Sequence, residues 1–255
     1  MGNKLLLLIF CFFIHHAYAD KLNSDSWNDM RDIYLSGDSF VLDNNIKVIM
    51  QDLVEEPHEV SMVVKLPEYL YHMQELVVLI ENNPIQEALR LYPYRYIERV
   101  GMNVRLENNS PVRVAVLKDN TWHIGSKMVY VSSPGGCSLP SCDPSKENCS
   151  NSEIGKSFLK SYKRTNNAQR IKYKISHPMD TGFVIDNLGQ SIPEYYIKNI
   201  SFADEKGMIA NVETSAALST DPVFLLDLQT STSNITVNAV DSKGIEYGQQ
   251  PTVSW

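Results

Sequence analysis

Three cysteines that lie close together in one polar stretch carry the clearest potential for chemistry in this sequence. They are Cys137, Cys142 and Cys149; the fourth cysteine, Cys11, lies in a leader-like segment at the N-terminus. An odd number of cysteines in an exported protein leaves one thiol unpaired or pairs it between molecules. Cysteines this close in sequence link no distant parts of a chain, so they cannot cross-link a core. We therefore expect a chemically used thiol beside a local disulfide.

Cys137 has the most distinctive surroundings of the three. It follows Pro134, Gly135 and Gly136, in a stretch that we predict to be exposed. Glycine lacks a Cβ and tolerates most backbone angles, and Pro134 disfavours helical geometry at Ser133. The pattern indicates a flexible, extended arm that lets the thiol enter other proteins. The alternative for a Gly-Gly-Cys sequence is an ordinary linker.

The other two cysteines leave the disulfide pattern open. A Cys142–Cys149 bond would close a short loop and shorten the linker. A Cys137–Cys142 bond would instead mask Cys137, and if reversible it would form a thiol–disulfide switch. The sequence alone does not choose between the two pairings.

Neither a metal site nor a cofactor site is predicted. Imidazole and thioether groups suit copper, and candidate ligands occur at His58, Met62, His72, Met73, His123, His177 and Met179. They are scattered without a repeated ligand spacing, and Met62 falls within an apolar alternation typical of a core strand.

The elements that must position these residues are predominantly strands. A short helix is predicted over 25–35, because apolar residues recur on one helical face there. Period-two or β-rich runs then follow at 46–50, 59–64, 76–80, 112–116, 122–124, 128–131, 171–175, 195–202, 208–213, 223–228, 235–240 and 252–255. Turns are predicted at 118–120 and 241–244. Short strands at this spacing, with no long helix between them, indicate antiparallel sandwiches.

Composition divides the chain into segments. Residues 132–153 are rich in Ser, Pro, Gly, Cys, Asn and Asp and hold too few apolar residues to form a core. We predict an all-β fold with two immunoglobulin-like β-sandwich domains joined by a flexible cysteine-containing linker. The predicted segments are 20–133 for the first domain, 134–160 for the arm and linker, and 161–255 for the second domain.

The N-terminus and the net charge indicate an exported protein. Lys4, the apolar run from Leu5 to Ile14 and the small-x-small sequence ending at Ala19 predict a signal peptide over 1–19. That run is shorter than the ~20 residues that span a bilayer, and no later segment approaches this length. The formal net charge of −7 argues against a nucleic-acid-binding surface. We expect neither a membrane nor a nucleic acid as partner.

The second half resembles the Z subunit of the sulfur-oxidation carrier complex SoxYZ, over about 165–255. The resemblance rests on Ile175-Ser176-His177-Pro178-Met179-Asp180-Thr181-Gly182, on Ile192-Pro193 with Tyr196-Ile197, on Asp221-Pro222-Val223-Phe224 and on Val240-Asp241-Ser242-Lys243-Gly244. The first half resembles the Y subunit more weakly, through the strand ending at Val131 that leads into Gly135-Gly136-Cys137.

This resemblance implies a function for Cys137. In the Y subunit a Gly-Gly-Cys-Gly-Gly tail carries sulfur intermediates covalently on its cysteine. In this chain Ser138, Leu139 and Pro140 replace the two following glycines, and the cysteine lies between domains. Both differences shorten the reach of the arm.

The Y-then-Z order is similar to fused SoxYZ-like carriers found near quinoprotein dehydrogenases. It implies a periplasmic carrier, without catalysis of its own, whose Cys137 is loaded and unloaded by partner enzymes, with the two halves packed together. The alternative from another class is a non-covalent binding or chaperone module for a quinoprotein dehydrogenase.

Overall fold

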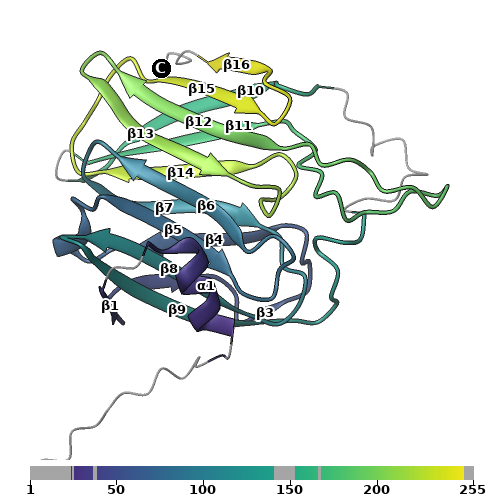
Figure 1. Cartoon of the computed structure of the whole chain (residues 1–255). Helices are drawn as coiled ribbons and strands as arrows, with labels where there is room; N and C mark the ends of the chain where they lie inside the picture. The colour runs from purple at the N-terminus through teal and green to yellow at the C-terminus, as the bar shows by residue number, and fades with distance from the viewer. Residues whose placement is uncertain (1–23, 25, 37–38, 141–152, 166–167, 250–255) are drawn as a thin grey trace, which may run out of the picture.

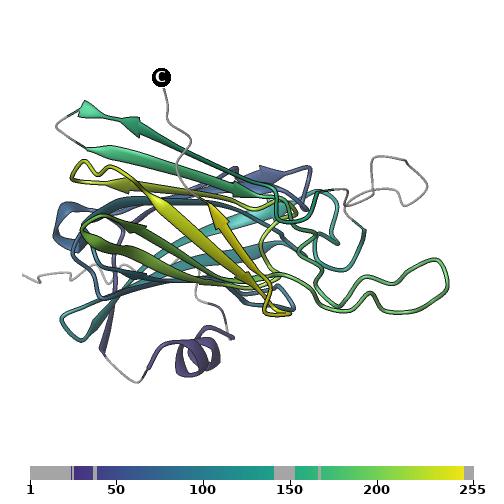
Figure 2. The same cartoon turned by 90° about the horizontal axis from the view of Figure 1, so that it is seen from above.

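A computed structural model describes residues 24, 26–36, 39–140, 153–165 and 168–249, and these residues form two stacked sheets (Figures 1 and 2). The ten-stranded sheet has the spatial order β1 (Ser39–Leu42), β9 (Thr121–Val131), β8 (Ser110–Lys118), β5 (Glu75–Ile80), β6 (Glu87–Pro93), β13 (Gly207–Thr214), β12 (Ile197–Asp204), β15 (Thr236–Asp241) and β16 (Glu246–Gln249), with β3 (Leu53–Val54) paired to β9. The six-stranded sheet has the order β10 (Ser157–Lys163), β11 (Gln169–Ile175), β14 (Val223–Leu228), β7 (Ile97–Val104), β4 (Val60–Lys65) and β2 (Lys47–Ile49). The predicted all-β class is confirmed.

The predicted N-terminal helix is present as α1 (Ser26–Tyr34), and it covers part of the outer face of the ten-stranded sheet (Figure 2). Its buried residues Trp27 and Met30 pack against outward-facing side chains of β5, β8 and β9. The guanidinium of Arg113 lies 4.3 Å from the Trp27 ring centroid and also pairs with Glu81. A 3-10 turn, η1, spans Glu68–Leu70.

The two predicted turns close hairpins as expected. Asp119 and Asn120 connect β8 to β9 with φ angles of 49° and 58°. Two adjacent residues with positive φ are the requirement of a type I′ turn, which matches the twist of the paired strands. The β15–β16 hairpin turns through Gly244, whose φ is 81°.

The two halves of the chain share both sheets. β6 of the first half pairs with β13 of the second, and β7 pairs with β14, so each sheet runs across the junction without a break. One hydrophobic core contains residues of both halves, including Leu91, Met102, Val212 and Phe224. The expectation that the halves pack together is therefore confirmed, and the junction consists of backbone hydrogen bonds between strands.

The connection between the halves differs in extent from the prediction, because β10 begins at Ser157, inside the range 134–160 assigned to arm and linker. The predicted signal peptide at 1–19, Cys142, Cys149 and the strand predicted at 252–255 lie outside the described residues. Among the residues that are described, no helix is long and apolar enough to cross a membrane.

Candidate functional site

Cys137 lies in a compact turn that packs against the end of the six-stranded sheet. After β9 the chain folds back, and the backbone N–H groups of Gly135 and Gly136 donate to the carbonyl oxygens of Glu107 and Leu106, at 2.9 and 3.1 Å. Leu139 N then donates to Gly135 O at 2.9 Å, which closes the turn. We call residues 135–139 the Cys137 turn. Cys137 within it is a free cysteine and is 0 % exposed.

This position corrects the prediction that the Gly-Gly-Cys stretch is exposed and extended. A Cβ on Gly136 would collide with the carbonyl oxygens of Pro57 and Leu106, and Gly135 has a φ of 118°. Both glycines are required here by close backbone approach and by an unusual backbone angle. In the structure the two glycines allow the turn to pack tightly, whereas the sequence suggested that they make the arm flexible and extended.

The carboxylate of Glu107 holds the turn from the side of the first half. Its Oε2 accepts hydrogen bonds from the backbone N–H groups of Cys137 at 3.0 Å and Ser138 at 3.1 Å. Its Oε1 accepts from Ser138 Oγ at 2.6 Å. Hydrogen bonds to an ionised acceptor are the stronger kind in proteins, so this single side chain fixes the backbone on which the thiol sits.

The second half holds the same turn through Thr181, which follows the His-Pro-Met-Asp segment singled out in the sequence. Thr181 Oγ1 donates to Cys137 O at 2.7 Å. Thr181 lies near the start of a long loop, residues 180–195, that projects beyond the strand ends (Figures 1 and 2). Cys137 is therefore bound by both halves at once.

A buried arginine joins the two halves beneath the turn. Arg105 is 4 % exposed, and its guanidinium donates to Gly136 O at 3.3 Å and to Thr220 Oγ1 at 2.9 Å. It also donates to the carbonyl oxygens of Pro178, Met179 and Leu218 in the second half. His58 Nδ1 lies 3.1 Å from Gly136 O, and because a carbonyl oxygen can only accept, the proton of this hydrogen bond belongs to His58.

The electrostatics of the docked turn keep the thiol protonated. The pKa of Cys137 is raised to about 12, chiefly by burial and in addition by the nearby Glu107 carboxylate, while Arg105 opposes both effects. Only the thiolate is a strong nucleophile. In this position the Cys137 thiol is therefore both buried and protonated, which makes it a poor nucleophile.

His177 is buried beside this site and has a structural role. Its pKa is lowered to about 4, chiefly by burial, and its ring lies 4.4 Å from that of Tyr195. Its Nδ1 accepts a hydrogen bond from Met179 N at 3.2 Å. The neutral imidazole thus fixes the turn after β11.

Sequence reasoning did not identify the residues that surround Cys137. His58, Arg105, Glu107 and Thr181 are separated from it by many residues, and none has a spacing typical of a site. Thr181 falls in the Z-like motif and His58 was considered only as a copper ligand, whereas Arg105 and Glu107 were not singled out at all. Within the described residues, no group of three or more His, Cys, Asp or Glu side chains could hold a metal ion.

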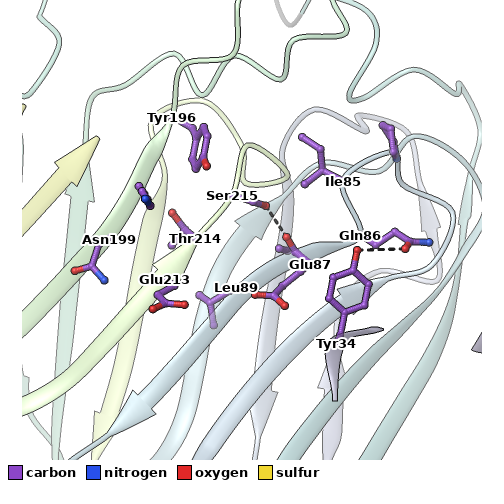
Figure 3. Close-up of a pocket in the computed structure, with 13 residues that line it drawn as sticks. Tyr34, Ile85, Gln86, Glu87, Leu89, Tyr196, Asn199, Glu213, Thr214 and Ser215 are labelled. Atoms are coloured by element: carbon purple, nitrogen blue, oxygen red, sulfur yellow. Dashed lines mark hydrogen bonds between the residues drawn. The ribbon is translucent and has the colours of Figure 1, made fainter. Parts of the chain in front are cut away.

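A groove of about 600 Å³ lies elsewhere, over the junction of β6 and β13, and Cys137 is not among its lining residues. Figure 3 shows Tyr34 of α1 and Tyr196 of the second half on opposite sides of it, with Glu87 between them and Glu213 on the side of Tyr196. The candidate site remains the Cys137 turn, in which the cysteine is buried.

The fold and the site define a class of protein: a double-sheet sandwich of two joined halves that both bind one buried cysteine. Residues 32–137 match the family described as "Sulfur oxidation protein SoxY", and residues 159–251 match "Sulphur oxidation protein SoxZ". The chain is a fused SoxYZ-like protein, with the SoxY part first. The SoxY match ends at Cys137 itself.

The solved structures that resemble this chain include a distant neighbour that is also a SoxY protein. The sulfur carrier protein SoxY from Chlorobium limicola f thiosulfatophilum aligns over 42% of this chain and 96% of its own, with 11% sequence identity and a TM-score of 0.38. No curated protein matches the sequence of this chain.

Proposed function

We propose that this protein is a thiol carrier that holds a covalent sulfur intermediate on Cys137 and presents it to partner enzymes. The observation that carries the proposal is the position of Cys137: a free thiol at the end of the SoxY match, bound by Glu107 of the SoxY part and Thr181 of the SoxZ part. Both family descriptions name sulfur oxidation.

Carrier chemistry on this chain needs two states of the turn. In the docked state the thiol is buried and protonated, which protects it from unspecific oxidation. In the open state Cys137 loses its proton and its Sγ forms a bond to a sulfur atom of the cargo. The two electrons released as this S–S bond forms pass to a redox cofactor of the loading enzyme. A second partner later cleaves the bond by supplying two electrons from its own reductant; Cys137 takes up a proton and the cargo leaves as a sulfur anion.

Compartment and partner follow from the sequence. The predicted signal peptide at 1–19 supports export, which in a bacterium with a SoxYZ system means the periplasm. A quinoprotein dehydrogenase system is the partner that we infer from the fused Y-then-Z order. The protein itself supplies no catalysis in this proposal, since the partners activate the thiol.

The burial of Cys137 favours one second candidate, a non-covalent binding module in which the cysteine is only a packing residue. The two candidates make opposite predictions for the protein purified from its native host without reductant. A carrier shows an added sulfur-containing mass on the peptide of Cys137, and Cys137→Ser abolishes its function. An unmodified Cys137 under every growth condition, together with a fully functional Cys137→Ser protein, would establish the non-covalent module instead.

A further inference from the structure

We propose that the outer face of the six-stranded sheet is a docking surface for a partner protein with an acidic surface, the partner that acts on Cys137. This inference rests on the proposed carrier function, because it names the chemistry of the partner that serves the same site. It stands on the cross-strand register of that face, on its charge and on its connection to the Cys137 turn.

The register places cations and aromatic rings side by side on β10 and β11. Directly opposite residues of an antiparallel pair point to the same side of the sheet, and the pairs here are Phe158 with Lys174, Lys160 with Lys172, and Tyr162 with Arg170. The intervening Leu159, Ile171 and Tyr173 are buried in the core. Phe158 and Tyr162 are 51% and 40% exposed, respectively.

The same register extends this surface across the sheet. Arg170 aligns with Asp227 of β14, which aligns with Arg99 of β7, and the row continues through Lys65 of β4 to Lys47 of β2. The row beside it continues from Lys172 through Leu225, Gly101 and Val63 to Ile49. The second row is a mainly apolar strip, with Arg99, Lys65 and Lys47 along one side of it and Lys172 at its β11 end, which is a composition that suits a protein interface.

Several of these cross-strand pairs bring like charges together. Lys160 lies opposite Lys172, Lys47 opposite Lys65, and Lys65 opposite Arg99. Like charges directly opposite each other destabilise a sheet. The chain is acidic overall, with 30 Asp and Glu against 23 Lys and Arg, so its composition does not force this arrangement. A partner that supplies carboxylates would turn the repulsion into attraction.

Protection of sheet edges accounts for only part of this pattern. β10 and β2 are the two edges of the sheet, and lysines on edge strands prevent unwanted strand pairing. Lys65 and Lys172 lie on interior strands, where no edge needs protection. Asp227 is fully buried and pairs with Arg164 and Arg170. Among the described carboxylates, none lies within ion-pair distance of Lys160 or Lys172.

The face ends at the Cys137 turn. Lys174 Nζ lies 3.6 Å from Asp221, at the start of the segment that leads into β14. The preceding residue, Thr220, accepts a hydrogen bond from Arg105, which in turn donates to Gly136 O. A protein seated on the six-stranded sheet would therefore lie at the rim from which Cys137 emerges when its turn opens.

The test is a charge reversal at Lys172 with a matched control. Lys172→Glu creates an opposite-charge pair with Lys160, so the fold is kept or slightly stabilised. Lys198→Glu makes the same charge change on an exposed position of the ten-stranded sheet. The readout is the initial rate at which Cys137 gains cargo in soluble extract of the native host supplied with thiosulfate, by peptide mass spectrometry, at low and at physiological ionic strength.

We expect Lys172→Glu to slow loading about tenfold at low ionic strength, where charge steering is strongest, with a smaller effect when salt screens the charges. Lys198→Glu should load at the wild-type rate, and both variants should keep the wild-type iodoacetamide reactivity of Cys137. Equal loading of Lys172→Glu and wild type would overturn the inference.

A binding measurement keeps the inference testable if the carrier proposal fails. If wild-type Cys137 is never loaded, the carrier proposal is refuted. Binding to poly-L-glutamate and to phosphatidylglycerol vesicles then tests whether the face of the six-stranded sheet binds an acidic protein. Binding to poly-L-glutamate that Lys172→Glu weakens and Lys198→Glu does not supports the acidic-protein surface. Equal binding by all three proteins overturns it, and so does binding to the vesicles without binding to poly-L-glutamate.

Discussion

The Glu107 carboxylate is the side chain whose removal should most clearly expose the Cys137 thiol. Glu107→Ala removes the acceptor of three hydrogen bonds that hold the turn, at 3.0, 3.1 and 2.6 Å. A hydrogen bond to a charged group contributes about 1.5–3 kcal/mol when buried. Glu107 is partly exposed, and water can replace it as the acceptor when the turn opens. We therefore estimate that the three hydrogen bonds together stabilise the docked turn by about 2 kcal/mol.

That loss shifts the equilibrium between docked and open turn by about 30-fold, since 1.4 kcal/mol corresponds to a factor of ten. The assay is iodoacetamide labelling of Cys137, followed at the peptide level so that Cys142 and Cys149 do not contribute. If opening precedes reaction, the labelling rate of Glu107→Ala should exceed that of wild type by about the same factor. Glu107→Gln keeps one acceptor oxygen and should lie between the two.

A matched control separates the effect of hydrogen bonding from that of charge. Glu194→Ala removes an exposed carboxylate on the projecting loop and should leave the labelling rate unchanged. A Glu107→Ala rate within about twofold of wild type, which is below the effect of a single hydrogen bond, would refute the reasoning. It would mean that Glu107 does not hold the turn, or that the docked thiol reacts without opening.

Three further results are expected. Gly136→Ala places a Cβ against the carbonyl oxygen of Pro57, so it should lower the free energy of unfolding in urea by about 1–3 kcal/mol or open the turn. Gly248→Ala is the control, because its Cβ meets no close contact. Thr181→Val removes the donor to Cys137 O and should raise Cys137 labelling about fivefold, the effect of about 1 kcal/mol, while Thr181→Ser keeps the wild-type rate. The labelling rate of native Cys137 should continue to rise above pH ~8.5, where the rate of the unfolded protein levels off.

The sign of the pH effect follows from the raised pKa. Docking favours the protonated thiol, so its stabilisation is complete below the ordinary thiol pKa of about 8.5 and is lost as pH rises toward about 12. Over that range docking weakens by about 1.4 kcal/mol per pH unit, and the population of reactive thiolate keeps increasing. A native protein whose labelling levels off at the same pH as the unfolded protein would show that Cys137 is not buried in solution.

The sequence by itself determined the local elements whose signals are periodic or conformational. The helix near Trp27, the hairpin turn at Asp119 and Asn120, and strands with clean alternation such as Ile171–Ile175 were predicted correctly. Each depends on interactions between residues close in sequence, or on burial of one face. Cys137 was also singled out from sequence, because a cysteine after two glycines is visible without a structure, but its state as a free thiol was not.

Tertiary structure alone decided how the halves join and where Cys137 lies. β6 and β7 were not predicted, because both pair with strands of the other half and are interrupted by residues such as Arg90 and Gly101 that break simple alternation. The docked turn depends on Glu107 and Thr181, which meet Cys137 only after the sheets have formed. Glycine is favoured both where a backbone is flexible and where it packs closely. The two glycines beside Cys137 therefore indicated an unusual backbone conformation, but only the fold showed that this backbone is held in place.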